Sequence, residues 1–595
     1  ARRRSRRSRR QVGGARSDVT TRTRIALLLV AAAGAFALPA AAWAHAVLEH
    51  TTPLPSAIVD RPPPVVLLSF SEAVEPRFAV VSVTNAAGQQ QIAGAPRRSA
   101  SDPDTLVVPL HHLAAGWYLV YWRVISVDGH PVRNAFTFGV GPNPGPLPQF
   151  PVPSISETAA TPSLVTARAI VFLAVMAAIG LFVLRIATAR PVVRRVSGTR
   201  LRAVSIAFGI AAVIGLVATP IYVEMATAQF ALRSAFSIGS VLPLVHDSAF
   251  GRGFLDLELA FALFTLAAGL AIWLDRPERP ERSVAELLAT SGALLAAGAL
   301  LFVPGLSGHA AQTSPRGLSV VLDWLHLVSG SVWVGGLIGL LVLWQSLPVG
   351  RRVAGLVVCV PRFSNTAFVS VLALIGSGVG ASLIHLPTLS SLWQTSYGQA
   401  LLVKIGLLCA ALLLAAVNLL RTKPRLAASG DRPELGPGTA VLLRRLVSAE
   451  TVLVAAAVTA AAVLSSLPPP AKALATAGSA RAHVGPGPVQ EVVNQDGYRI
   501  ALGVAPNRAA APNAVALRVT KGGQPVRHAT VVAGFSMLDM EMGTQSYTLP
   551  ESAPGVYKRA VQALVMVGHW GLSFEITPPG GGQAFTVTFI DRAAG

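Results

Sequence analysis

The residues in this sequence that could do chemistry begin with an aspartate and a histidine inside an apolar stretch. Asp323 and His326 lie within 317–345, a run long enough to cross a bilayer, since a spanning helix needs about 20 mostly apolar residues. Their i, i+3 spacing places both side chains on one helical face. An aspartate in a span costs on the order of 3 kcal/mol, so the pair indicates either an interhelical hydrogen bond or an ion site or pathway.

The composition predicts an integral membrane protein with some soluble mass. Of 595 residues, 52% are hydrophobic and 13% are charged. Much of the net charge of +21 comes from the arginine-rich start and from short connections between apolar runs. This distribution is typical of a membrane protein and not of a nucleic-acid-binding face. Cys359 and Cys409 form no CxxC motif, and the sequence has no P-loop.

Residues 1–44 have the pattern of a secretory signal peptide. An arginine-rich start precedes a short apolar run over Ile25–Pro39, and Ala42-Trp43-Ala44 is a small-x-small sequence. Cleavage after Ala44 makes His45 the expected N-terminus of the mature chain. An N-terminal histidine offers a free amine and an imidazole nitrogen on one residue, which together can chelate a metal.

Residues 45–142 are predicted to form an exported β-sandwich, because short runs of alternating apolar residues are separated by Pro-, Gly- and Asn-rich turns. Asp128-Gly129-His130 follows a long strand. With His45 it supplies an amine, two imidazoles and a carboxylate, a set of donors that suits square-planar Cu(II). A plain hairpin turn is the alternative interpretation. The six prolines of residues 143–163 indicate a semi-rigid linker. The predicted strands are Val65–Ser71, Phe78–Thr84, Thr105–Leu110, Trp117–Val127 and Ala135–Val140.

Residues 164–467 contain eight apolar runs, which we interpret as eight transmembrane helices. Every second connection is rich in arginine and lysine, as in 185–202 and 421–445 with six basic residues each, and the alternate connections hold only three. By the positive-inside rule, the basic connections are cytoplasmic and both chain ends lie outside the plasma membrane. The runs fall near 165–187, 203–226, 254–274, 284–304, 318–345, 364–386, 398–420 and 445–467.

Polar residues of the bundle gather on the outer side of this predicted topology. Imidazole suits copper, so we predict an outward-facing copper vestibule with His326 deepest, about 15 Å into its span. Ordinary histidines at headgroup level are the alternative. Lys404 and Glu450 are expected to pair further in, as a structural contact. The vestibule residues are His246, His309, His326, His385 and Asp323.

After a linker at 468–487, residues 488–595 are predicted to form a second exported β-sandwich. Soft sulfur and imidazole suit Cu(I), so four methionines and one histidine of this domain form a predicted Cu(I) site. Filling of a core gap by methionine is the alternative. These residues are Met537, Met540, Met542, Met566 and His569. The predicted strands are Tyr498–Val504, Ala514–Thr520, His528–Ala533, Gly555–Arg559, Gly571–Ile576 and Phe585–Phe589.

Three resemblances accompany these patterns. His45-Ala-Val-Leu-Glu-His50 with Ser126-Val-Asp-Gly-His-Pro131 resembles the periplasmic CopC family, which implies Cu(II) ligands at His45, Asp128 and His130. Asp323-Trp-Leu-His326 and Leu401-Leu-Val-Lys404 resemble the CopD-type copper-resistance membrane domain, which implies copper import or handling. The C-terminal region resembles small YtkA-like domains. The fold class is therefore a membrane all-α eight-helix bundle flanked by two all-β Ig-like sandwiches.

The expected function is copper transport or resistance, without catalysis: the chain captures Cu(II) outside the cytoplasmic membrane and passes copper through the bundle for import. Its partners are then copper ions, the lipid bilayer and periplasmic copper chaperones, with no nucleic acid.

One alternative is an enzyme, a haem-containing cupric reductase with histidines as axial ligands. Another is a copper buffer or sensor that transports nothing. The direction of flux, the transported oxidation state, the electron donor and the oligomeric state stay open.

Overall fold

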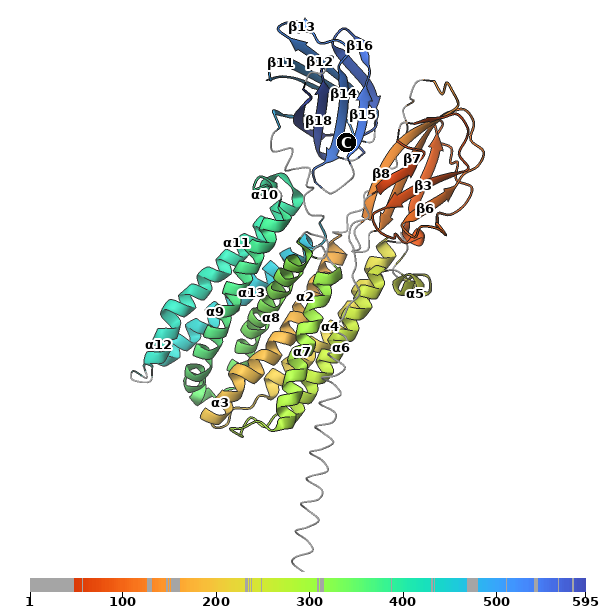
Figure 1. The fold of residues 1–595 in the computed structure, drawn as a ribbon. Helices are drawn as coiled ribbons and strands as arrows, with labels where there is room; N and C mark the ends of the chain where they lie inside the picture. Colours follow the sequence, from red (N-terminus) through yellow and green to blue (C-terminus); the bar gives the residue numbers. More distant parts are fainter. Residues whose placement is uncertain are drawn as a thin grey trace, which may run out of the picture.

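In a computed structural model, the chain forms one β-domain, then a bundle of helices, and then a second β-domain (Figure 1). The structure describes residues 48–594 with gaps at 56, 126–130, 146–147, 149, 151–160, 231–233, 235, 237, 248, 308–309, 311–314, 387, 430–431, 433, 468–479, 510, 540–543, 566 and 581–582.

The N-terminal domain is a sandwich of two four-stranded sheets, with strand orders β1-β3-β6-β5 and β2-β8-β7-β4. Alternate residues of β3 point inward, because successive side chains of a strand face opposite sides. Phe70 from one sheet meets Trp122 from the other edge to face, with ring centroids 5.2 Å apart. The strands are β1 (Leu48–Thr52), β2 (Ile58–Val59), β3 (Val65–Phe70), β4 (Val80–Asn85), β5 (Arg97–Arg98), β6 (Thr105–Pro109), β7 (Gly116–Ile125) and β8 (Pro131–Val140).

Strand β7 is buried on both of its faces. Val120 and Trp122 belong to the sandwich core. Leu119 and Tyr121 point the other way, yet they are only 1% and 4% exposed. The outer face of an antiparallel sandwich sheet is usually solvated and polar. An apolar outer face therefore requires another part of the chain to cover it.

The middle of the chain forms helices because its apolar runs must satisfy their backbone polar groups internally to cross a bilayer. Eight described helices are long and apolar enough to do so, as predicted. The helices are α2 (Pro162–Leu184), α3 (Arg190–Arg195), α4 (Arg202–Phe230), α5 (Ile238–Asp247), α6 (Ala249–Leu274), α7 (Val284–Ser307), α8 (Arg316–Ser346), α9 (Arg352–His385), α10 (Ser391–Gln394), α11 (Ser396–Val417), α12 (Lys423–Ala428) and α13 (Leu435–Leu464).

Helices α2 and α8 approach each other very closely near the middle of the bundle. A Cβ added to Gly335 on α8 would lie 2.5 Å from the Cα of Gly180 on α2. Only glycine at both positions permits this backbone contact, as is common where membrane helices pack without large side chains between them. The contact fixes α8, which carries Asp323 and His326, against the first helix of the bundle.

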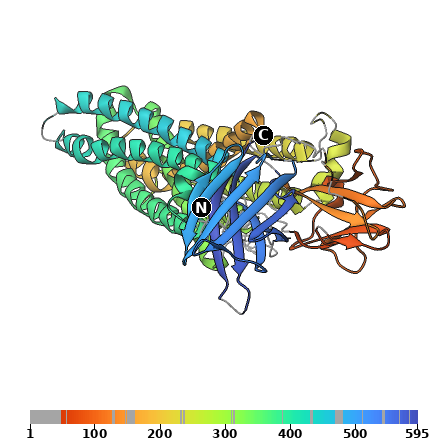
Figure 2. The same ribbon diagram turned by 90° about the horizontal axis from the view of Figure 1, so that it is seen from above.

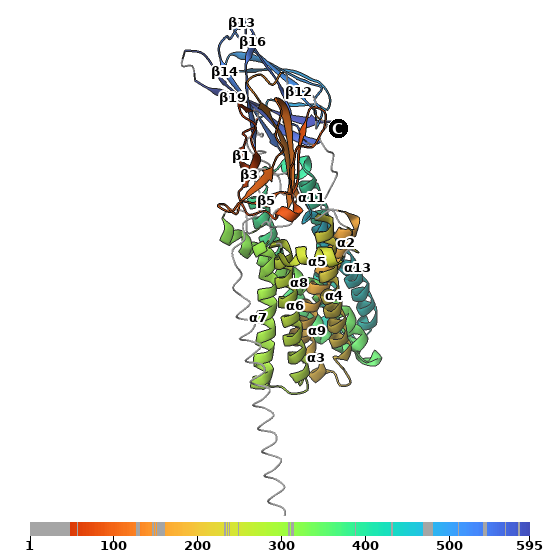
Figure 3. The same ribbon diagram turned by 90° about the vertical axis from the view of Figure 1, so that its right-hand side faces the viewer.

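Both β-domains lie beyond the same end of the bundle, the end at which α2 begins and α13 ends (Figure 1). We call this the domain end. The view from above and the side view place the two domains next to each other there (Figures 2 and 3). An even number of crossings returns the chain to the end at which it entered, in agreement with the topology predicted from the sequence.

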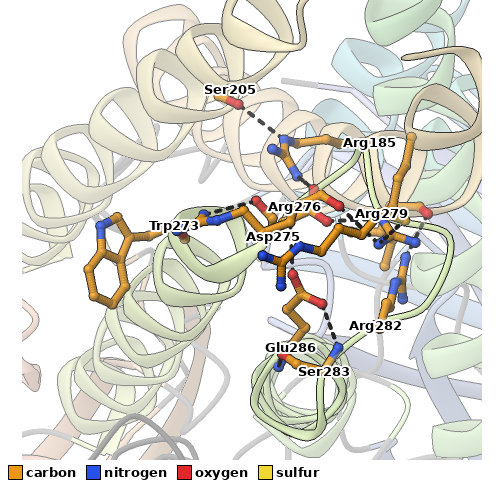
Figure 4. A network of polar contacts seen from close by, with 11 residues as sticks. Arg185, Ser205, Trp273, Asp275, Arg276, Arg279, Arg282, Ser283 and Glu286 are labelled. Atoms are coloured by element: carbon orange, nitrogen blue, oxygen red, sulfur yellow. Dashed lines mark hydrogen bonds and ion pairs between the residues drawn. The ribbon is translucent and has the colours of Figure 1, made fainter. Parts of the chain in front are cut away.

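At the opposite end of the bundle, buried arginines and acids join α2, α3, α6 and α7 (Figure 4). Asp275 receives a 2.5 Å bond from Arg185 Nη1 and a 3.0 Å bond from Arg190 Nε. Ser283 and Glu286 form a reciprocal capping box at the start of α7, because each backbone N–H is bonded by the other side chain. The basic connections are therefore partly structural, since two of their arginines neutralise one buried carboxylate.

The C-terminal domain is a second two-sheet sandwich, as predicted. One sheet has the order β10-β11-β12-β17-β16, and the other has the order β15-β14-β18-β19-β9. The strands are β9 (Ala482–Val484), β10 (Val489–Gln495), β11 (Tyr498–Ala505), β12 (Asn513–Lys521), β13 (Gln524–Pro525), β14 (Thr530–Met537), β15 (Gln545–Leu549), β16 (Glu551–Ala553), β17 (Val556–Val561), β18 (Gly568–Thr577) and β19 (Phe585–Ala593).

We predict that Asp275→Ala destabilises the bundle by about 3–5 kcal/mol, because removing one partner leaves buried arginines without a counter-charge. Thermal unfolding of the purified protein in detergent, followed by tryptophan fluorescence, measures the effect. Glu278→Ala is the matched control, since Glu278 is an exposed acid in the same connection. Equal midpoints for the two variants would show that the ion pairs of Asp275 do not hold this end together.

Candidate metal sites in the bundle and the C-terminal domain

His326 lies where α8, α9 and α11 meet, and both of its ring nitrogens have partners. Its Nδ1 is 3.2 Å from Ser377 Oγ on α9, and its Nε2 is 3.4 Å from Lys404 Nζ on α11. Gly378 makes room for the ring, because a Cβ there would lie 3.2 Å from His326 Cε1. The sequence predicts the position of His326 in its span, and the fold adds the two neighbours.

The hydrogen bonds assign a direction to this chain of polar groups. Ser377 Oγ lies 2.6 Å from the carbonyl oxygen of Ala373, to which its single proton is donated. Ser377 therefore accepts from His326, so Nδ1 carries the hydrogen and Nε2 presents a lone pair. Lys404, which has only donors, points its Nζ at that lone pair. The nitrogen best suited to bind a metal thus faces an ammonium group when no metal is bound.

Asp323 supplies the negative charge of the same cluster. The Asp323 carboxylate interacts electrostatically with the ammonium group of Lys404 and with the hydroxyl group of Tyr397, both on α11. Its Oδ2 lies against α7, where a Cβ added to Gly305 would approach it to 3.1 Å. Asp323 and His326 of α8 therefore form one polar group with Tyr397 and Lys404 of α11, and all four residues are half-buried.

The predicted contact between Lys404 and Glu450 is replaced by other partners. Glu450 Oε1 accepts from Trp333 Nε1 at 3.1 Å, and its Oε2 accepts from Asn418 at 3.4 Å. Lys404 instead lies beside His326 and Asp323. The two charges sit at different depths, since Lys404 is in the third turn of α11 whereas Asn418 follows its last residue.

The other predicted vestibule residues are only partly described. His385 is the last residue of α9, at the domain end. His246 lies on α5, but its side chain is outside the described part of the chain, as is all of His309. The cluster around His326 is therefore the part of the vestibule that the described residues define.

Two of the five residues predicted to bind Cu(I), Met537 and His569, lie on adjacent strands, but Met537 pairs with Trp570, so its side chain and that of His569 lie on opposite faces of the sheet. Met537 ends β14 with its side chain 3% exposed in the sandwich core. His569 is the second residue of β18. A Cβ on Gly568, next to His569, would lie 2.5 Å from Met537 Cε and 2.5 Å from Asp539 Oδ2, so Met537 and Asp539 both approach the backbone of Gly568. Met540, Met542 and Met566 lie outside the described residues.

Asp539 orients His569 in the manner of an outer-shell carboxylate. Its Oδ1 accepts from His569 Nδ1 at 3.1 Å, and its Oδ2 accepts from the backbone N–H of the same residue at 2.8 Å. Carboxylates hold metal-binding histidines in this way, leaving Nε2 as the ligand atom. The hydrogen bond to Asp539 raises the pKa of His569. Protons therefore compete for His569 at a higher pH than for an isolated imidazole.

The predicted Cu(II) ligands His45, Asp128 and His130 all lie outside the described residues. Within the described part of the chain, no three His, Cys, Asp or Glu side chains are placed to hold a metal ion together. The described portions of both candidate sites combine one imidazole with other polar groups: Lys404, Ser377 and Asp323 in the bundle, and Asp539 in the C-terminal domain.

Four residues of these clusters, Tyr397, Lys404, Ser377 and Asp539, were not among the predicted site residues. Lys404 was visible as a charge within a span, and its partner was misassigned because helix neighbours cannot be read from spacing. Asp539 was visible as an acid between methionines. Ser377 carried no signal, since serines are common in membrane helices and only the fold places this one beside His326.

Three family models match successive parts of the chain: CopC domain over 48–141, Copper resistance protein D over 357–464 and YtkA-like over 493–575. Copper transport protein CutJ of Bacillus subtilis (strain 168) is 27% identical over 549 residues, which are 90% of this chain and 93% of CutJ. Protein YobA of Escherichia coli (strain K12) is 38% identical over 99 residues, 16% of this chain and 80% of YobA. The crystal structure of CopC from Methylosinus trichosporium OB3b is 30% identical and covers 17% of this chain and 100% of that one, with a TM-score of 0.16.

The eight apolar helices and the two sandwiches define a multi-pass membrane protein with two extramembrane β-domains. Through its N-terminal domain the chain belongs to the CopC family, and the same chain continues into a CopD domain and a YtkA-like domain.

Proposed function

We propose that this protein is a copper importer of the cytoplasmic membrane, in which the CopC domain captures Cu(II) and the helix bundle passes copper inward. The observation that carries the proposal is the likeness to a copper transport protein along 90% of the chain, which includes all three domains. The His326 cluster supplies a polar position inside the apolar bundle, which a transport path requires.

Capture begins at the N-terminal domain. His45, once exposed by removal of residues 1–44, binds Cu(II) through its amine and imidazole, and Asp128 and His130 complete the site. These four donors are nitrogens and an oxygen, which suit Cu(II). The arginine-rich connections at the far end of the bundle support a topology with both β-domains outside the cytoplasm.

Passage through the bundle uses His326 Nε2. Lys404 stands 3.4 Å from that nitrogen, so an arriving copper ion must displace the ammonium. Two unit charges 4 Å apart repel by about 4 kcal/mol at an effective dielectric constant of 20, which prevents both cations from staying. Lys404 thereby keeps the affinity of His326 for copper low enough for release, and Asp323 balances whichever cation is present.

The C-terminal domain holds copper at His569, with Met540, Met542 and Met566 as the sulfur ligands of a Cu(I) site. Asp539 sets the orientation of the imidazole. Sulfur and imidazole ligands together favour the reduced ion. The sequence has no P-loop, so import in this scheme follows a gradient, the membrane potential or sequestration of copper in the cytoplasm.

For capture, we predict that the leader-processed protein loses most of its Cu(II) affinity when His45 is replaced by Ala or its amine is acetylated, because the chelate loses one or both of its nitrogens. Titration of the full chain with Cu(II), followed by EPR, measures the affinity. His112→Ala is the control, since His112 is an exposed histidine of the same domain. An unchanged affinity in the acetylated protein would eliminate the N-terminal site.

For passage, we predict that His326→Ala abolishes copper uptake into proteoliposomes while the protein remains folded. Ser377→Ala should lower the apparent copper affinity by about 10-fold, since loss of an outer-shell partner of a metal-binding histidine costs about 10–100-fold. Uptake of radioactive copper measures both variants. Parental uptake by His326→Ala would reduce the residue to an interhelical contact. A Soret band in the spectrum of the purified protein would instead favour the haem-containing reductase.

A further inference from the structure

The two β-domains contact each other along β7 and β8 of the first domain and β15 and the segment 559–565 of the second, a contact that we call the seam. Gln545 at the start of β15 donates its side-chain N–H to Asn134 Oδ1 at 2.6 Å and to the carbonyl oxygen of Ala135 at 3.3 Å. Both partners belong to β8, whose residues 131–137 pair with β7 on one side and with no described strand on the other. The C-terminal domain therefore covers an open strand edge.

The apolar outer face of β7 is buried in the same seam. Leu119, Tyr121 and Ala135 form a buried cluster with Phe150 of the linker, and Val565 of the C-terminal domain packs against this cluster. A face that would be polar in an isolated sandwich is here an internal interface between two domains of one chain. A cavity at the seam is consequently shaped by both domains at once.

One cavity at the seam, of about 240 Å³, has walls from both domains, and the structure describes every residue that lines it. The CopC domain contributes Trp117 from β7 and Thr137 from β8, and the C-terminal domain contributes Tyr547 and the stretch 559–562. Pockets for drug-sized ligands measure about 300–1,000 Å³, so this cavity suits a smaller molecule. It is partly open to solvent, which gives such a molecule access.

Gln562 gives this cavity a polar group that needs a partner. It follows directly on β17 between Val561 and Ala563, which are both fully buried, and it is itself only 6% exposed. The Nε2 and the Oε1 of its side chain both lack a hydrogen-bond partner in the part of the chain that the structure describes. A buried amide without partners costs free energy that a bound molecule recovers. A ligand that satisfies Gln562 must offer an acceptor to Nε2 and a donor to Oε1.

The rest of the wall narrows the chemistry of the ligand. Arg559 is the only charged residue among those that line the cavity, and its guanidinium lies 5.6 Å from the ring centroid of Tyr547. One of its five N–H groups donates to the carbonyl oxygen of Thr548 at 3.1 Å. With no acid among the lining residues, the guanidinium favours a carboxylate on the ligand. Trp117 and Tyr547 add aromatic surface, which suits an apolar group.

We propose that this cavity binds a free α-amino acid between the two β-domains. The ligand carboxylate lies toward Arg559 and accepts from Gln562 Nε2, and the ligand ammonium group donates to Gln562 Oε1. Its side chain packs between Trp117 and Tyr547. The inference is independent of the proposed copper transport, because no predicted copper ligand lines the cavity. Since the ligand touches both domains, its binding also stabilises the docked arrangement.

The ligand class is tested by equilibrium binding to the full chain, purified in detergent and freed of copper, with glycine, L-leucine and L-phenylalanine as probes. We expect at least one of them to bind at one molecule per chain. Its analogues without the carboxylate or without the amino group should bind about 10–100-fold more weakly, because each loses hydrogen bonds made by a charged group. Absence of binding by all three probes would show that the cavity holds only water and would overturn the proposal. Equal binding of the analogue without the amino group would overturn the assignment to an amino acid.

The position of the ligand is tested by two substitutions. Gln562→Met keeps the length of the side chain and removes its hydrogen bonds, so it should weaken binding about 10–100-fold. Gln524→Met, at an exposed glutamine of the same domain, is the matched control and should bind as the parent does. Trp117→Leu should weaken binding about tenfold, although it lies in the other domain, because the ligand loses an aromatic wall.

The remaining outcomes are also decisive. Parental binding by Gln562→Met would overturn the role of the amide. Parental binding by Trp117→Leu would place the ligand on the C-terminal domain alone and overturn a site between the domains. Gln562→Met should fold at least as well as the parent, because it removes a buried amide without partners, and thermal unfolding checks this. If Trp117→Leu fails to fold, Trp117→Ala and Trp117→Phe are read in the same way.

Discussion

The structure depends on one constraint: a polar group inside the hydrocarbon layer must find its partner within the protein. Three described polar sites of the bundle meet this requirement in different ways. Asp275 forms ion pairs with Arg185 and Arg190 at one end. Glu450 is satisfied by the indole of Trp333 and the amide of Asn418. The cluster of Asp323, His326 and Lys404 differs, because Lys404 directs its ammonium group at the lone pair of His326 Nε2.

That difference separates a structural polar contact from one suited to transport. A carboxylate held by two hydrogen bonds, such as Glu450, gains nothing by releasing its partners. A lysine beside a histidine lone pair can be exchanged for another cation, and the neighbouring aspartate keeps the local charge balanced. The close approach of α2 and α8 at Gly180 and Gly335 holds the helix that carries this histidine against the first helix of the bundle.

A related constraint shapes the extramembrane part. Apolar surface on the outer face of β7 must be removed from water, and the chain does this with its own C-terminal domain. The contact also caps the open edge of β8, which would otherwise be free to pair with other chains. The two sandwiches consequently act as one unit at the domain end of the bundle, although the whole membrane domain separates them in sequence.

Much of this could be predicted from the sequence. Eight apolar runs, alternating basic connections and two sets of short strands predicted the fold class, because length, hydropathy and period-two alternation depend only on local residues. The depth of His326 followed from its position in the run. Eight strands were missed, and all of them except the seven-residue β10 are five residues or shorter: β1, β2, β5, β9, β10, β13, β15 and β16.

The partners of the polar residues could not be predicted in the same way. Lys404 was expected beside Glu450, but the rotation and neighbours of α11 place it beside His326. Ser377 and Asp539 acquired their roles only when the fold brought them to a histidine. The sequence by itself determined which residues carry charge, imidazole or sulfur and how deep in the bundle they lie, because these depend on spacing along one helix or strand. Only the tertiary structure decided which of them meet, because contacts between helices, and between two domains over 400 residues apart, depend on packing that no local pattern encodes.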